Sequence, residues 1–128
     1  MTGQAVALLA ILFLTHFLGD FTPLASARIQ DAKVRGKPLG PIALHAAIHA
    51  TLVGVAVAAV ARPVPLLVAA AVAVEFWTHL VLDWFRGWLG ASRSALSDPS
   101  GQAFWTALGI DQLAHALVLV WIADLVLR

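Results

Sequence analysis

The chain lacks cysteine altogether and carries little charge. Its 128 residues include no Cys, and Asp, Glu, Lys and Arg make up 12% of the chain against 61% hydrophobic residues. The absence of Cys excludes disulfides, thiolate ligands, iron–sulfur clusters and cysteine nucleophiles, so any metal site must use nitrogen and oxygen ligands. Because soluble domains carry about 25% charged residues, this composition, with a mean hydropathy of +0.89, indicates an integral membrane protein.

Two further absences limit partners and processing. The formal net charge of +1 provides no basic surface, and we expect no nucleic-acid partner. The first 15 residues lack the Lys/Arg-rich start of a secretory signal, and the apolar run continues into His16 and Asp20. We therefore expect no cleaved signal peptide.

Four long apolar runs predict the fold. They cover about residues 4–21, 41–61, 66–89 and 103–127 and are too long and too continuously apolar for strands. The prediction is an all-α four-transmembrane-helix bundle that forms a single membrane domain over residues 1–128. The polar stretch after the first run, with Arg28, Lys33, Arg35 and Lys37, fits either a short interfacial helix or a plain loop.

The basic residues predict how the bundle is oriented. The first connection carries four Lys/Arg and the third has Arg86 and Arg93 beside or within it, whereas the opposite side has Arg62 and Arg128. Cytoplasmic loops are enriched in Lys and Arg. We expect both termini on the extracytoplasmic side of a bacterial inner (cytoplasmic) membrane.

All five histidines belong to pairs spaced four residues apart within the apolar runs. The pairs are His16 with Asp20, His45 with His49, His79 with Asp83, and Asp111 with His115. Residues at this spacing lie on one helix face, so each pair projects two ligand-type side chains to one side. In the predicted topology all four pairs fall in the same membrane half, which favours one site that opens to the cytoplasm.

The energetics of burial favour a metal at this site. An Asp at the centre of a membrane helix costs about 2.5–3.5 kcal/mol, and a divalent cation would offset that cost. Five His and three Asp suit about two ions with a position left for water or substrate. Zinc is the default for so many imidazoles, with manganese or iron also compatible. Glu75, one turn before His79, is predicted to orient His79 or to act as a general base, and is a candidate ninth ligand.

A structural polar network is the alternative interpretation. An isolated His-x-x-x-Asp pair in a membrane helix is more often a salt bridge or a helix contact than a metal ligand. The common depth of four such pairs favours metal binding over that alternative.

The same residues resemble the successive motifs of a known family. The motifs are His16-Phe-Leu-Gly-Asp20-Phe21, His45-Ala-Ala-Ile-His49, Thr78-His79-Leu-Val-Leu-Asp83-Trp84-Phe-Arg86 and Asp111-Gln112-Leu-Ala-His115. In this order and spacing they resemble the bacterial membrane family catalogued as domain of unknown function 3307. Leu24, in a region where Gln is common, and Arg86, where Lys is usual, depart from its pattern. A looser resemblance to membrane-bound metal-dependent hydrolases implies hydrolysis.

Three functions are compatible with these residues. The first is a metal-dependent hydrolase with a dinuclear site, acting on an amphipathic, lipid-like or phosphoester substrate at the cytoplasmic leaflet. The second is transport or sensing of a divalent cation or protons, which would require a homo-oligomer because four short spans leave little room for alternating access. The third is a b-type haem protein, which the neighbouring carboxylates argue against.

Overall fold

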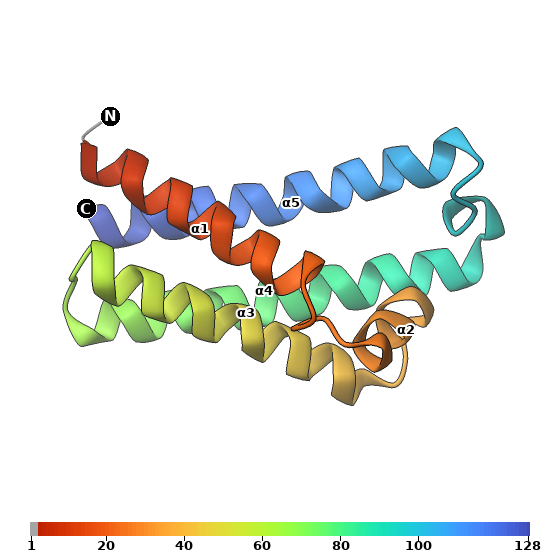
Figure 1. Cartoon of the computed structure of the whole chain (residues 1–128), viewed down its shortest axis with the longest axis horizontal. Helices are drawn as coiled ribbons and strands as arrows, with labels where there is room; N and C mark the ends of the chain where they lie inside the picture. The colour runs from red at the N-terminus through yellow and green to blue at the C-terminus, as the bar shows by residue number, and fades with distance from the viewer. Residues whose placement is uncertain (1–2) are drawn as a thin grey trace.

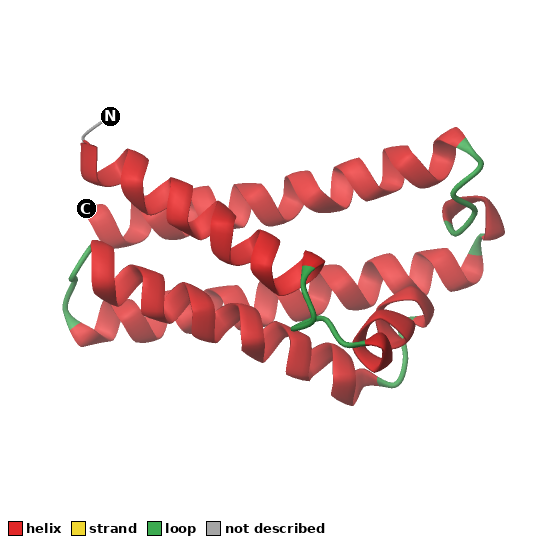
Figure 2. Ribbon diagram, viewed as in Figure 1, coloured by secondary structure: helices red, strands yellow, loops and turns green. Residues whose placement is uncertain are grey.

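Four long helices run back and forth in the computed structural model, which describes residues 3–128 (Figures 1 and 2). They are α1 (Gly3–Phe21), α3 (Leu39–Val60), α4 (Pro65–Ser92) and α5 (Gln102–Leu127). Each is long and apolar enough to cross a membrane. A short helix, α2 (Ala27–Arg35), joins α1 to α3, and a 3-10 turn, η1 (Ser94–Leu96), lies between α4 and α5. The described residues contain no strand, and the fold is the predicted all-α membrane bundle.

Local sequence signals set most of the helix ends. Helix α1 stops at Phe21, just before Thr22-Pro23, since proline cannot continue a helix without losing a hydrogen bond. Helix α4 has Pro65 in its first turn, where no hydrogen-bond donor is needed, and runs three residues beyond the predicted end at Leu89. The stretch that fitted either a loop or a helix forms α2, which ends at Gly36 with a left-handed φ of 66°.

The long helices have unequal lengths, and the difference shapes one end of the bundle. Helix α1 has 19 residues and α4 has 28. At 1.5 Å per residue α4 is about 42 Å long, which exceeds the roughly 30 Å of a hydrocarbon core. The end of α4 and the start of α5 therefore project past α1, and α2 and η1 pack against that projecting end (Figure 1).

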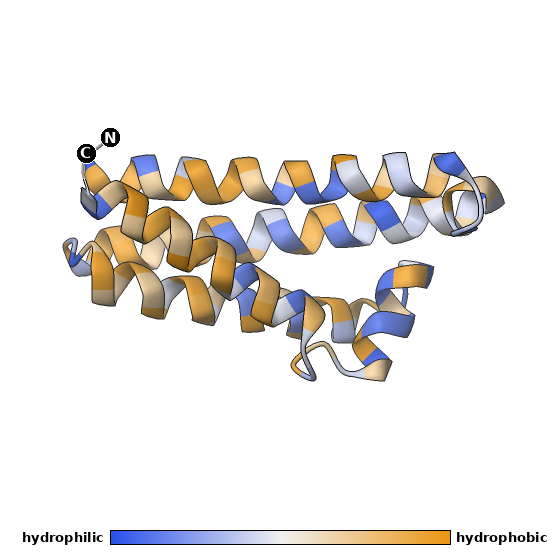
Figure 3. Cartoon of the chain, turned by 45° about the horizontal axis from the view of Figure 1, so that its top comes forward, coloured by the Kyte–Doolittle hydropathy of each residue, from blue (hydrophilic) through white to orange (hydrophobic). Residues whose placement is uncertain are grey.

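The interior of the bundle divides into an apolar half and a polar half. The apolar half lies nearer the termini and contains Leu8, Leu12, Val53, Val57, Ala71, Leu119 and Ile122. The polar half lies nearer α2 and buries Asp20, His45, His49, Glu75, His79, Asp83 and His115. Figure 3 shows the same division, with hydrophilic residues concentrated toward the α2 and η1 end. Four helices thus bring their titratable groups to one level.

Candidate metal centre

The five imidazole rings gather into one cluster, to which all four long helices contribute. Ring centroids lie 3.8 Å apart for His49 and His79, 4.4 Å for His79 and His115, and 4.6 Å for His45 and His49. His16 is 5.2 Å from both His49 and His115. The i,i+4 pairs predicted from the sequence therefore lie together in the polar half of the interior.

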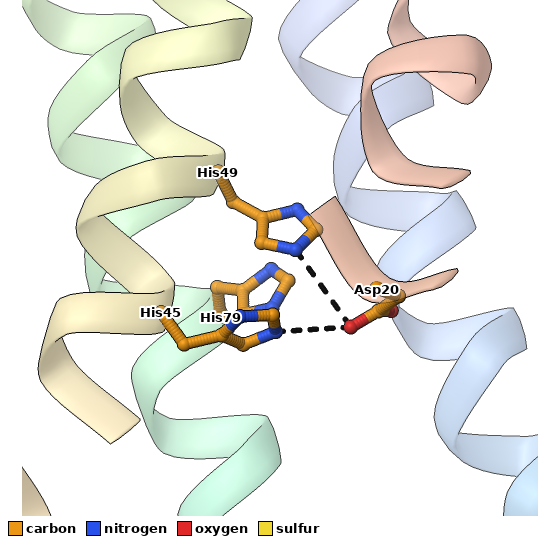
Figure 4. A group of neighbouring side chains, drawn as sticks. All are labelled: Asp20, His45, His49 and His79. Carbon is orange, nitrogen blue, oxygen red and sulfur yellow. Dashed lines mark hydrogen bonds and ion pairs between the residues drawn. The ribbon is translucent and has the colours of Figure 1, made fainter. Parts of the chain in front are cut away.

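One group of possible ligands comprises Asp20, His45, His49 and His79 (Figure 4). All four residues are buried, and one ligand atom from each lies within 4.8 Å of the others. Asp20 Oδ1 is 2.9 Å from His45 Nε2 and 3.7 Å from His49 Nε2. Two imidazoles from α3 thus face a carboxylate from α1 and an imidazole from α4, which is a donor set that could hold a divalent ion.

A second group comprises His79, Asp83 and His115, again within 4.8 Å of one another. His79 Nε2 is 3.4 Å from Asp83 Oδ2, and His115 Nε2 is 3.8 Å from Asp83 Oδ1. His79 belongs to both groups, and one imidazole nitrogen ligates one ion at a time. The arrangement offers two overlapping positions, and simultaneous use of both would need a further donor.

The remaining predicted ligands, His16 and Asp111, lie beside these two groups. His16 Nε2 is 3.2 Å from Asp20 Oδ2 and 3.3 Å from Gln112 Oε1. Asp111 accepts a hydrogen bond from His115 Nδ1 through its backbone carbonyl at 2.9 Å, while its carboxylate Oδ1 is 3.9 Å from the same nitrogen. Both residues are close enough to support the ligand groups but do not belong to either.

Hydrogen bonds behind two of the histidines fix which nitrogen faces the centre. His79 Nδ1 donates to Glu75 Oε1 at 3.1 Å, and His115 Nδ1 donates to the Asp111 carbonyl. Each bond leaves the Nε2 lone pair available, which is the usual arrangement of a metal-ligating histidine. Glu75 is thus placed to orient His79, and it is absent from the lining of the neighbouring cavity.

Several buried atoms in the two groups have no hydrogen-bond partner. They are His45 Nδ1, His49 Nε2, His79 Nε2, His115 Nε2 and Asp83 Oδ2. An unsatisfied buried polar atom costs about 1–3 kcal/mol. A cation in the first group would compensate His49 Nε2, and one in the second would compensate His115 Nε2 and Asp83 Oδ2, so each donor set fits a metal ion.

Lys33 enters the same cluster from α2, and the sequence did not predict this. Its Nζ is 2.7 Å from Asp20 Oδ1, 3.3 Å from Asp83 Oδ2 and 2.9 Å from His45 Nε2. Burial opposes its charged form, but the carboxylates of Asp83 and Asp20 outweigh that effect and raise the pKa of Lys33 above its usual range. By sequence, Lys33 is one of four basic residues in the first connection, whereas its ammonium group lies between the two ligand groups.

A pattern in the sequence of α2 could have revealed this position. Ile29, Ala32 and Lys33 have the i, i+3, i+4 spacing of one helix face, and Ile29 and Ala32 are buried. The apolar face of the short helix therefore includes Lys33. Without a defined helix, the stretch gave no reason to separate Lys33 from Arg28 or Lys37.

A contact between two glycines holds α2 against α4. A Cβ atom on Gly87 would lie 2.1 Å from the Lys33 carbonyl oxygen and 2.5 Å from Gly36 N. A Cβ atom on Gly36 would meet Trp88 N at 2.7 Å. The two backbones approach closely because neither residue has a side chain, and this contact sets the position from which Lys33 reaches the cluster.

A cavity of about 440 Å³ extends from the cluster toward α2 and η1. Its charged lining residues are Asp20, Asp83, Asp111, Lys33 and Arg86, of which Arg86 lies further along α4 than Asp83. Phe21, Val34, Leu96, Phe104 and Leu108 supply apolar walls. The cavity gives small molecules a space beside the ligand groups. It lies on the side of the basic connections, where the site was predicted to open.

Comparison with known proteins identifies the chain at the level of a family model. A model described as a protein of unknown function (DUF3307) matches residues 8–128, which include every residue of the cluster. Neither the curated proteins nor the solved structures include a match to this chain.

Proposed function

This chain belongs to the DUF3307 family of proteins of unknown function, and from the geometry of its site we propose that it is a membrane-embedded, metal-dependent hydrolase. The observation that carries the proposal is the pair of overlapping His/Asp groups, buried and oriented, beside a cavity that carboxylates line. Purely structural networks satisfy their own buried atoms, whereas three Nε2 atoms in this one make no hydrogen bond and lie 3.4–3.8 Å from a carboxylate oxygen.

Each residue has a role in this proposal. Asp20, His45, His49, His79, Asp83 and His115 bind a divalent ion, with zinc favoured. A second ion would need a further donor, because His79 belongs to both groups. Bound zinc would supply a water of lowered pKa and positive charge against the developing oxyanion. Glu75 orients His79. His16 contacts Asp20 and Gln112, and Gln112 donates to the Asp111 carboxylate. Asp111 lines the cavity outside both ligand groups, so we assign to it the proton-accepting role that the sequence had suggested for Glu75.

The membrane setting follows the predicted topology. The cavity lies at the end of the bundle that carries the basic connections, and we propose that it faces the cytoplasmic leaflet of a bacterial inner membrane. A substrate there would be lipid-borne or amphipathic, with a phosphoester as the preferred bond. One chain supplies all the donors, so this function does not need a homo-oligomer.

Metal analysis of purified variants tests the proposal. We expect bound zinc in the wild-type protein, loss of most of it in Asp83→Ala and His49→Ala, and retention in Asp98→Ala, whose carboxylate lies in an exposed loop and contacts Ser100. Asp111→Asn should keep its zinc yet release phosphate from phosphatidic acid in mixed micelles at least 100-fold more slowly. Equal metal content in all four variants would refute the metal centre.

A second candidate, transport or sensing of cations or protons, has one specific observation in its favour. Lys33, Asp20 and Asp83 form a charged network within the bundle, and such networks mark ion and proton pathways in membrane proteins. Substrate-independent proton uptake by vesicles containing the protein would support this candidate over hydrolysis.

The haem alternative is disfavoured by the packing of the rings. The imidazole centroids in contact lie only 3.8–5.8 Å apart, and three carboxylates lie among or beside them. A porphyrin requires an apolar slot between its axial ligands, and here the rings themselves occupy that space.

A further inference from the structure

Arg86 is a cation in the cavity wall that the proposed hydrolytic site does not use. It lies on α4 one turn beyond Asp83, on the same face, and lines the same cavity. Its Nη2 donates to the carbonyl oxygen of Leu96 at 2.9 Å, and the guanidinium carbon lies 5.8 Å from the centroid of the Phe104 ring. These contacts hold the guanidinium group in place beside the cavity.

The guanidinium group of Arg86 forms no ion pair with another described residue. No salt bridge joins it to a carboxylate within residues 3–128, although Asp20, Asp83 and Asp111 line the same cavity. Its Nε is buried and has no hydrogen-bond acceptor. A positioned guanidinium with an unsatisfied donor is a binding group for an anion, and its planar fork suits phosphate oxygens in particular.

The cavity that Arg86 lines also has apolar walls. Phe104, Leu108 and Leu96 line it, and Phe21, 63% exposed, lies at the cavity where α1 ends. A cavity of about 440 Å³ is large enough for a head group and the first part of a chain. The lining therefore matches a molecule with an anionic head and an apolar tail.

We propose that Arg86 determines specificity by binding the phosphate head group of an amphipathic phosphate monoester, whose tail packs on Phe104 and Leu108. The inference rests on the proposed function and names its substrate class. The head group lies between Arg86 and the ligand groups one turn away, so that its ester bond faces the nucleophilic water. With divalent ions bound, the carboxylates at the inner end no longer repel it.

Binding of dodecylphosphonate to zinc-loaded protein in dodecyl maltoside tests the proposal. The carbon–phosphorus bond of this probe resists hydrolysis, so calorimetry measures affinity whether or not the protein is a hydrolase. We expect Arg86→Gln to weaken binding at least tenfold and Arg86→Lys, which keeps the charge but not the planar fork, to weaken it less. This difference separates loss of charge from loss of folding. Arg93→Gln is the matched control, because Arg93 is exposed and outside the cavity lining. It should change the dissociation constant less than twofold.

Two shorter probes distinguish the source of the head group. We expect methylphosphonate and inorganic phosphate to bind at least 30-fold more weakly than dodecylphosphonate. Equal affinity of all three probes would overturn the amphipathic substrate and leave free phosphate as the ligand. Equal effects of Arg86→Gln and Arg93→Gln would overturn the role of Arg86. Failure of the metal centre would appear separately, as absent metal in the wild-type protein. Titrations repeated without zinc would then still measure whether Arg86 binds the probe.

Discussion

Lys33 shows most clearly what one residue contributes to this site. It reaches two carboxylates that are 13 positions before it and 50 positions after it in the chain. Its ammonium group balances their charge when no other cation is close, and so it competes with a metal ion for the same oxygens. The His/Asp cluster was predictable because the two members of each pair have the spacing of one helix face. Lys33 was not, because its partners belong to other helices.

Replacing Lys33 should separate these two effects. In Lys33→Met the metal-free protein loses the partner of Asp20 and Asp83, and removing one member of a buried ion pair costs about 3–5 kcal/mol. The same change removes a competing charge, so zinc should bind roughly tenfold more tightly. Thermal unfolding in detergent with and without zinc measures both effects. Arg35→Met on the same helix breaks an exposed pair with Asp31 and should alter stability by less than about 1 kcal/mol. Weaker zinc binding in Lys33→Met would contradict the competition.

Gly19 affects the site by leaving room for the His49 ring rather than by carrying charge. A Cβ atom there would lie 2.3 Å from His49 Nε2 and 2.4 Å from Cε1, which is the ligand edge of that ring. Gly19→Ala must displace the imidazole, and we expect at least a tenfold loss of zinc affinity in a competition titration. Gly109→Ala is the control, since Gly109 lies in α5 with no neighbour within 4 Å of the added atom. It should keep the affinity and stabilise the helix by up to about 1 kcal/mol. Equal affinities would show that His49 is not a ligand.

At the scale of elements, the four long helices and their inward faces were predictable, because apolar length and i,i+4 spacing are properties of each run alone. The role of α2 was not predictable in the same way. Nine residues cannot form a stable helix in isolation, so α2 depends on packing against α4, and that packing needs the glycines of both partners. Gly36 and Gly87 lie on two separate segments, and two single glycines form no periodic pattern in the sequence.

The contact between α2 and α4 can be tested at Gly87. An added methyl group would overlap the Lys33 carbonyl and the Gly36 backbone, neither of which can move without shifting the short helix. We expect Gly87→Ala to destabilise the protein by about 1–3 kcal/mol and to remove hydrogen-exchange protection from the amides of α2 while those of α3 and α5 stay protected. Gly40→Ala, where the added atom meets nothing within 4 Å, should leave α2 protected. Retained protection in Gly87→Ala would mean that α2 is held by other contacts.

For the whole molecule, the orientation in the membrane remains a prediction, and the absence of cysteine makes it easy to test. Val64 lies in the turn between α3 and α4 and Ser94 in η1, and both are exposed. An impermeant maleimide should label Val64→Cys from outside intact cells and Ser94→Cys in inverted vesicles alone, because the basic connections are expected in the cytoplasm. The reverse pattern would place the cavity on the outer side.

The apolar half of the interior has a consequence for the membrane as a barrier. Leu8, Leu12, Val53, Leu119 and Ile122 are at most 2% exposed and fill the bundle between the histidine cluster and the ends of the chain. A hydrated ion that entered through the α2 end would meet close-packed hydrocarbon there, without any polar group to replace its water. The polar half is thus closed at its inner end. We expect a bilayer that contains this protein to show no measurable ion conductance, even when ions occupy the polar half.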